Sequence, residues 1–254
     1  MPYLTELSSY ISFDNEMNQN ITIKMEIESG KSATTIVPVN NHLDAFVDLI
    51  NNDIESIILG YNVNNQVVID QLIKSLPQEL GRKIPNEILF SLSITAAKLA
   101  AEYNNMELYR YLSGPRNIVL PQVVIKKEVY DLHNLNESKG MIKQVSSIEM
   151  VKDDLANLAF LDLYSINQTT INNLKKKYPN LMFISKKKLE HSYQYFDIYE
   201  YQVVSDVLNA SANFINTKYL DSSLADLSIA LKTEYLYVNN NVLNRLLNIL
   251  NEEK

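Results

Sequence analysis

Apolar and polar residues alternate along the first part of the chain, which is typical of β-strands with one buried face. In the stretch ITIKMEIES, every second residue from Ile21 to Ile27 is apolar and the residues between them are polar or charged. A turn at Ser29-Gly30-Lys31 and the stretch ATTIVP follow, which predicts a hairpin or meander partner. We therefore expect β-structure between about Leu4 and Val37.

Helical spacing replaces this alternation further along. One apolar stripe runs from Leu43 to Ile58 and a second from Val68 to Leu76. After a start signal at Pro85-Asn86, the stretch NEILFSLSITAAKLAAEY is apolar on opposite sides, so it predicts a helix that is buried on both sides. The first 115 residues are thus expected to form a three-stranded sheet followed by a helical bundle.

Short strand-like and helix-like units alternate from about Leu158 to the end, beginning with LAFLDLYS and INQTTINNLKKKY and ending with TEYLYVN and NNVLNRLLNILNEE. This order predicts βα units and a largely parallel sheet. A complete eight-unit barrel takes roughly 200 to 250 residues, but 254 − 120 = 134 residues follow Leu120. We therefore expect an α/β fold with a reduced, incomplete TIM-type barrel over 118–254 and an α+β domain over 1–117. Residues 126–157 give no convincing register.

Composition indicates an ordinary globular protein, with 46% hydrophobic residues, 21% charged residues and a formal net charge of −7. The absence of cysteine excludes disulfides, thiolate catalysis and Cys-type zinc sites. No apolar run is long enough for a membrane span and no secretory signal is recognisable, so we expect a cytoplasmic protein. The negative charge makes nucleic acid an unlikely partner. No Gly-rich phosphate loop and no HExxH spacing are present.

Several segments resemble the enolase family, the phosphopyruvate hydratases, in the same order. They are ITIKMEIESGKSATTIVP, LGYNVNNQVVIDQLIKSL, NEILFSLSITAAKLAAEYNNMELYRYLSG followed by VLP, and LADLSIALKTEYLYVNNNVLNRLLNILNEE. The resemblance covers nearly all of residues 1–121 and, more faintly, about 158–254. It implies an enolase-like capping domain followed by a TIM-type barrel.

The resemblance also implies a Lys base, two Mg²⁺ ions held by three carboxylates, an assisting Glu, a His-Arg pair and a mobile Ser loop. Here Val37-Pro38 is followed by Val-Asn-Asn-His, where the family has Ser-Gly-Ala-Ser. The family's Asp-Asp-Leu metal motif aligns with Lys187-Lys188-Leu189, which reverses the charge of the site. The family's catalytic Lys falls near Ile198, its His-Arg pair near Thr217-Lys218 and its last active-site Lys near Tyr237.

Two family residues remain as candidates. Asp162 falls where the resemblance places a carboxylate ligand, and His133 has the family's spacing after Leu120-Pro121, although the Gly-Gly before it is absent. The segments that would carry the acid Glu residues and the first metal ligand are missing between His133 and Leu158.

These departures predict a non-catalytic enolase-like protein, without catalytic residues, metal or cofactor, that acts as a homo-oligomer or with a protein partner. The capping domain and an exposed barrel edge would supply the interface, and the aromatic-rich YQYFDIYEYQ segment suits one, although a buried strand is the commoner explanation of such a segment. An alternative is a metal-independent binder of a small phosphorylated or carboxylate ligand, with a basic site of Lys186, Lys187, Lys188, His191 and Lys218, although a solvated basic loop is the commoner explanation of such lysines. The third hypothesis is an active phosphopyruvate hydratase, which would require Mg²⁺.

Overall fold

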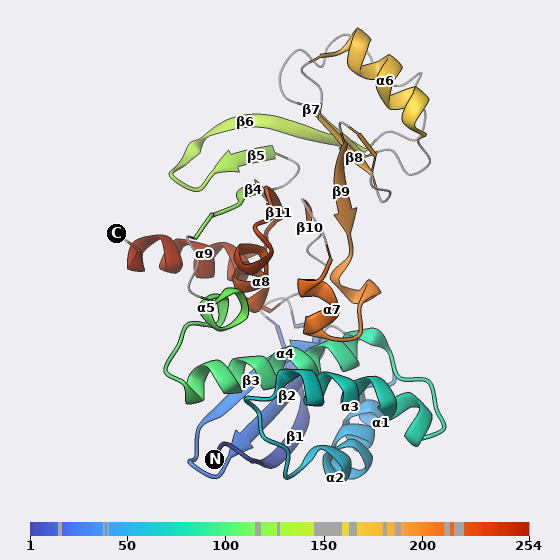
Figure 1. The fold of residues 1–254 in the computed structure, drawn as a ribbon, viewed down its shortest axis with the longest axis vertical. Helices are drawn as coiled ribbons and strands as arrows, with labels where there is room; N and C mark the ends of the chain where they lie inside the picture. Colours follow the sequence, from blue (N-terminus) through green and yellow to red (C-terminus); the bar gives the residue numbers. More distant parts are fainter. Residues whose placement is uncertain are drawn as a thin grey trace. The chain divides into compact units, whose positions relative to one another are not determined.

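A computed structural model gives the fold of the chain (Figure 1). The structure describes residues 1–14, 17–37, 39, 41–114, 118–125, 128–144, 159–162, 167–179, 182–185, 189–190, 192–210, 214–215 and 221–253. The chain forms two compact units. The first takes in 1–116, 198–210 and 218–230, and the second takes in 117–197, 211–217 and 231–254. The predicted domain boundary between residues 117 and 118 stays a prediction. Residues 198–210 and 218–230, which lie beyond this boundary in the sequence, belong to the first unit.

The first unit is built on an antiparallel sheet in the order β1-β2-β3, as the alternating pattern predicted. Its strands are β1 (Leu4–Phe13), β2 (Gln19–Ile27) and β3 (Ser32–Val37). In the central strand, Ile23 pairs with Ser9 on one side and Thr35 on the other. The apolar residues of β2 are fully buried, so this face of the sheet forms one wall of the core.

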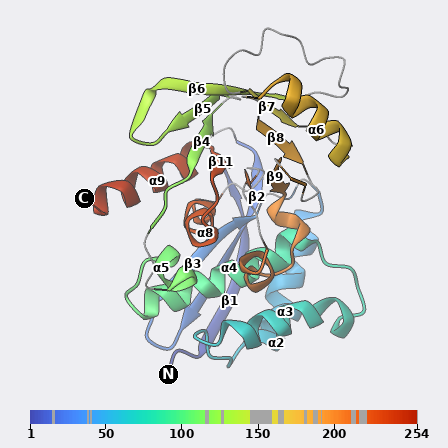
Figure 2. The same cartoon turned by 45° about the horizontal axis from the view of Figure 1, so that its top comes forward.

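Helices complete the first unit. They are α1 (Leu43–Asp48), a π-helical turn η1 (Leu49–Ile54), α2 (Glu55–Ile58), α3 (Gln66–Glu79), α4 (Asn86–Tyr103), α5 (Leu108–Ser113), a 3-10 turn η3 (Ile198–Glu200), α7 (Val204–Leu208) and α8 (Ser223–Leu231). The helix α4 packs against β2 and β3 and lies beside α3 (Figures 1 and 2).

The predicted burial of α4 on both sides is confirmed. Leu89 and Ala100 belong to the core beneath the sheet, and Phe90 and Ala97 on the other side are equally inaccessible. Polar Ser93 is also fully buried. An apolar stripe alone would leave such a polar position exposed, so its burial requires hydrogen-bond partners from other elements.

The second unit contains a closed eight-stranded barrel in the order β10-β11-β4-β5-β6-β7-β8-β9. Its strands are β4 (Gln122–Ile125), β5 (Glu128–Asp131), β6 (Asn134–Gln144), β7 (Ala159–Asp162), β8 (Met182–Ser185), β9 (Ser192–Phe196), β10 (Phe214–Ile215) and β11 (Tyr235–Tyr237). Of these strands, β5 alone runs against its neighbours, and the other seven are parallel to one another. The helices α6 (Gln168–Lys177) and α9 (Asn240–Glu252) also belong to this unit.

The expectation of an incomplete barrel is therefore wrong, because eight strands close the ring. The connections are shortened instead. Residues 126–127 join β4 to β5, and residues 132–133 join β5 to β6, so two short connections replace crossovers that normally need a dozen residues or more. Short strands, such as the two-residue β10, save further length. A closed barrel has no free edge, so the ring of described strands does not offer the barrel edge that was expected to dock a partner.

Candidate functional site

The carboxyl ends of the parallel barrel strands are the first place to look for a site, because barrel enzymes bind their substrates there. Neighbouring strand ends are in register, with Gln144 opposite Asp162 and Asp162 opposite Ile184. The seven parallel strands end in Ile125, Gln144, Asp162, Ser185, Phe196, Ile215 and Tyr237. Among these seven described residues, Asp162 is the one acid, and none is a His or a Lys.

A Mg²⁺ pair needs several carboxylate oxygens at one place. The strand ends supply a single acidic residue, so the described residues do not fit the two-metal arrangement that the enolase resemblance implies. In the part of the chain that the structure describes, no three His, Asp or Glu side chains gather closely enough to hold a metal ion. The prediction of a metal-free protein itself remains untested.

The two candidate family residues, His133 and Asp162, lie at opposite ends of the barrel. His133 precedes the amino end of β6, whereas Asp162 ends β7 beside Gln144, the last residue of β6. Strands rise about 3.3 Å per residue, so the ten steps from Asn134 to Gln144 separate the two levels by roughly 30 Å. The structure therefore does not bring these residues together.

His133 instead lines a cavity of about 400 Å³ at the amino end of the barrel. The backbone N–H of His133 donates to Asp131 Oδ1 at 3.0 Å, and Lys139 Nζ lies 2.7 Å from Asp131 Oδ2. The hydrogen bond from Lys139, with that from His133, lowers the pKa of Asp131 below its ordinary value. An ionised carboxylate with both oxygens engaged stabilises the turn between β5 and β6. The other lining residues are Ile118, Val119, Leu120, Pro121, Gln122 and Leu132.

The basic residues proposed as an anion site, Lys186, Lys187, Lys188, His191 and Lys218, lie outside the described residues. The strand before the lysines is confirmed, because β8 ends at Ser185. In the sequence, Lys186, Lys187 and Lys188 come directly after this strand.

The positions that align with two family lysines, Ile198 and Tyr237, lie in the part of the chain that the structure describes. Ile198 is fully buried at the start of η3, and Tyr237 ends β11.

A buried polar network at the start of α7 was missed by the sequence patterns. Ser93 Oγ donates to Asp70 Oδ1 at 2.6 Å and accepts from the backbone N–H of Val204 at 2.9 Å. Asp70 Oδ2 accepts from the backbone N–H of Ser205 at 3.0 Å, and Gln66 Nε2 donates to Asp70 Oδ1 at 2.8 Å. The network joins α3, α4 and α7. Burial, together with the charge of Asp70, raises the pKa of the Tyr111 hydroxyl.

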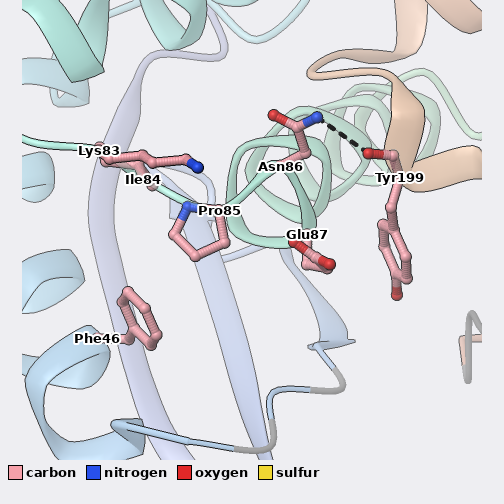
Figure 3. A pocket seen from close by; sticks show the side chains of 7 residues that line it. All are labelled: Phe46, Lys83, Ile84, Pro85, Asn86, Glu87 and Tyr199. Atoms are coloured by element: carbon pink, nitrogen blue, oxygen red, sulfur yellow. Dashed lines mark hydrogen bonds between the residues drawn. The ribbon is translucent and has the colours of Figure 1, made fainter.

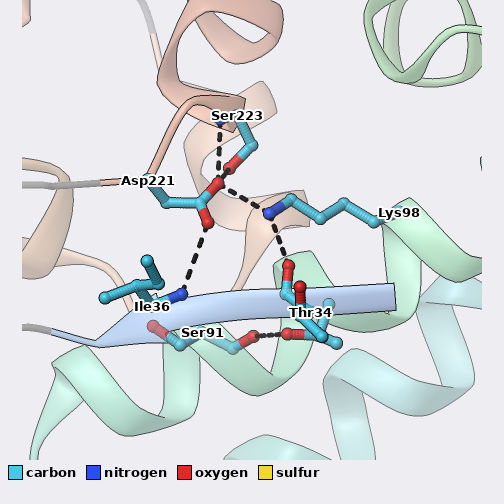
Figure 4. A network of polar contacts seen from close by, with 7 residues as sticks. Thr34, Ile36, Ser91, Lys98, Asp221 and Ser223 are labelled. Carbon is cyan, nitrogen blue, oxygen red and sulfur yellow. Dashed lines mark hydrogen bonds and ion pairs between the residues drawn. The ribbon is translucent and has the colours of Figure 1, made fainter. Parts of the chain in front are cut away.

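A second network centres on the ion pair between Lys98 and Asp221, whose atoms Nζ and Oδ1 lie 2.6 Å apart (Figure 4). Asp221 precedes α8 and accepts hydrogen bonds from the N–H and Oγ of Ser223. The sequence signal was present in Asp221-Ser222-Ser223 ahead of an apolar run, which resembles a helix start.

A second cavity, of about 430 Å³, lies at the start of α4 (Figure 3). Phe46 and Tyr199 contribute aromatic rings, and Asn86 Nδ2 donates to the carbonyl oxygen of Tyr199 at 3.0 Å. Lys83 and Glu87 add one charge of each sign. This lining does not assemble the groups of the reaction that the resemblance implies.

None of the described helices combines the length and apolar character that a bilayer crossing requires.

No protein-family profile matches the chain. Part of the chain is similar to enolases of two archaea. The enolase of Sulfurisphaera tokodaii is 26% identical over 152 residues, which cover 54% of this chain and 36% of that enolase. The enolase of Saccharolobus solfataricus is 34% identical over 80 residues, which cover 31% of this chain and 18% of that enolase. The matched stretches thus span little more than a third of one relative and less than a fifth of the other, and the chain has an enolase-like relationship over part of its length.

Proposed function

We propose that this protein is an enolase-related binding protein that does not dehydrate 2-phosphoglycerate and that acts through assembly with itself or with a protein partner. One observation carries the proposal. Among the described residues, the carboxyl ends of the barrel strands provide a single acid, Asp162, where the implied chemistry needs several carboxylates and basic residues around them.

The connection after β3 supports the same conclusion. The implied reaction uses a mobile Ser loop after the Val-Pro pair. Here only five residues separate Val37, the last residue of β3, from Leu43, the first residue of α1. The backbone N–H of Phe46 already donates to the carbonyl oxygen of His42. The connection has the sequence Pro-Val-Asn-Asn-His, so it contains neither the Ser nor the Gly that the implied loop uses.

The test is a coupled assay for 2-phosphoglycerate dehydration with saturating Mg²⁺, run beside size-exclusion chromatography with light scattering on the same sample. An authentic archaeal enolase serves as the positive control. We expect no turnover and a defined oligomer or a stable partner complex. Mg²⁺-dependent turnover that Asp162→Asn abolishes would overturn the proposal, because it would show a working site at this strand end.

A second candidate function is the binding of a small anion, favoured by the position of three lysines immediately after β8. Thermal-shift measurements with phosphate, 2-phosphoglycerate and citrate test it. Replacing Lys186, Lys187 and Lys188 together with Ala should abolish any shift.

The matched control replaces Lys175, Lys176 and Lys177 of α6 with Ala, which removes the same charge elsewhere in the unit. If no anion shifts the wild type, or both variants lose the shift equally, the lysines after β8 are not a specific site.

A further inference from the structure

Two charged side chains, those of Lys98 and Asp221, bond to the edge of β3 that faces no other described strand. β3 is the last strand in the order β1-β2-β3, so one of its sides has no strand partner among the described residues. On that side the backbone N–H of Ile36 donates to Asp221 Oδ2 at 3.3 Å, and the carbonyl oxygen of Thr34 accepts from Lys98 Nζ at 2.8 Å (Figure 4). An ion pair therefore uses the backbone groups that a further strand would need.

This ion pair is fixed from two helices. Lys98 comes from α4, and Asp221 stands before α8, where Ser223 donates two hydrogen bonds to Asp221 Oδ1. The Asp221 side chain is 8% exposed and that of Lys98 is 17% exposed. Burial works against the ionisation of Asp221, but the charge of Lys98 and the hydrogen bonds outweigh it and lower the pKa of Asp221.

The opposite edge of the sheet is occupied in a chemically different way. The backbone N–H of Ser9 in β1 donates to Asn51 Oδ1 at 2.6 Å, and Asn51 Nδ2 donates to the carbonyl oxygen of Ser9 at 2.9 Å. Asn51 belongs to the π-helical turn η1, so its side-chain amide pairs with β1 as a strand residue would. Nearer the start of β1, both backbone groups of Leu4 are bonded to the segment Gly60–Tyr61.

We propose that the Lys98–Asp221 pair is an edge lock, which keeps β3 from pairing with β3 of a second copy of this chain. Without the pair, the N–H of Ile36 and the carbonyl of Thr34 become free on one edge. Two such edges complement each other in an antiparallel pair. The ion pair stabilises the fold while it is charged, but two apolar residues of similar volume often stabilise a fold as well, so stability alone does not explain why charged residues stand at this edge. The inference is independent of the proposed function.

The first test replaces the pair with apolar residues in the full chain, as Lys98→Met with Asp221→Leu. Light scattering follows the mass from about 1 to about 500 μM, the range in which exposed strand edges associate. We expect the variant to reach at least twice the wild-type mass as the concentration rises.

The matched control is Lys24→Met with Glu26→Leu, which removes an ion pair of 2.8 Å from the central strand of the same sheet. The side chains of Lys24 and Glu26 are each 31% exposed, more than those of Lys98 and Asp221, so this control adds at least as much apolar surface without opening an edge and should keep the wild-type mass. The proposal fails if the edge variant also keeps that mass, or if the control associates to the same extent.

A second test does not depend on how the double variant folds. Amide hydrogen exchange of the wild-type protein should show both Ile36 and Ser9 protected, although each lies on a sheet edge. Asp221→Ala should speed the exchange of Ile36 roughly tenfold or more and leave Ser9 unchanged, and Asn51→Ala should do the reverse. Rapid exchange of Ile36 in the wild type would refute the lock outright.

Discussion

The hydroxyl of Ser93 offers the sharpest test of how the first unit is held together. Ser93 is fully buried in α4, and its Oγ contacts Asp70, Gln66 and the backbone N–H of Val204. The change Ser93→Ala removes one oxygen atom without adding volume. Any loss of stability therefore reports the hydrogen bonds and not a disturbance of packing.

The expected loss follows from the two strongest contacts. The N–H of Val204, in a residue with no exposed surface, would be left without its acceptor, which costs about 1–3 kcal/mol. The carboxylate of Asp70 would lose the hydrogen bond from Ser93 Oγ, and a hydrogen bond to a charged group is worth about 1.5–3 kcal/mol. The two terms overlap because one hydroxyl makes both contacts, so we expect a loss of roughly 3 kcal/mol. For a chain of this size that corresponds to a thermal midpoint lower by roughly 6–12 °C.

Urea and thermal unfolding followed by circular dichroism measure this change, and hydrogen exchange of the amides of Val204 and Ser205 locates it. The control is Ser56→Ala, which removes an exposed hydroxyl that bonds to the carbonyl oxygen of Asp53 nearby. The control should change stability by less than about 0.5 kcal/mol. If Ser93→Ala is no more destabilising than the control, Ser93 does not hold the start of α7 and the reasoning is wrong.

Three further predictions concern the same unit. Folding lowers the pKa of Asp221 from its ordinary value of 3.8, so its ion pair with Lys98 stabilises the fold fully above about that pH. This stabilisation is lost as the pH falls through the pKa of the folded state. The urea midpoint of the wild type should therefore decline more steeply below about pH 4 than that of Asp221→Asn. Ala96→Leu adds three carbons at a buried position of α4 and should lower stability by roughly 1–3 kcal/mol in urea unfolding, whereas an unchanged midpoint would reveal unfilled space. Gly30 has a φ of 79°, and no atom lies within 4 Å of the position that a Cβ would take. Gly30→Ala should therefore lower stability by about 1–2 kcal/mol from backbone strain alone. Gly30→Asn should lower it less in the same assay.

The sheet, the helices of the first unit and most barrel elements could be predicted because each depends on a local pattern. The alternation around Ile23 fixes which face of β2 is buried, and the double-sided apolar pattern of α4 fixes its central position. The β-strands and helices from β7 to α9 also follow from neighbouring residues, since strands and helices alternate along this part of the chain except between β8 and β9, where the structure describes no helix.

Closure of the barrel could not be predicted in this way. The argument from length assumed one helix for each strand, whereas β4, β5 and β6 follow one another through short connections. The turn after β5 contains Leu132 and His133 rather than an Asn-Gly or Asp-Gly pair, so the usual hairpin signal is missing. Pairing between β11 and β4 joins segments more than 100 residues apart, which no local pattern records.

The buried acids of the first unit share one structural role that bears on function. Asp70 accepts from a backbone N–H at the start of α7, Asp221 from one at the start of α8, and Asp226 from the N–H of Tyr109 at the start of α5. The first N–H groups of a helix have no partner within the helix, and these carboxylates accept hydrogen bonds from them. An acid held in this way anchors two elements of the first unit. Two of these contacts span more than 110 residues of sequence, so the acids connect α7 and α8, from the second half of the chain, to the N-terminal part. The three carboxylates therefore serve the fold of the first unit by holding the starts of α5, α7 and α8 in place.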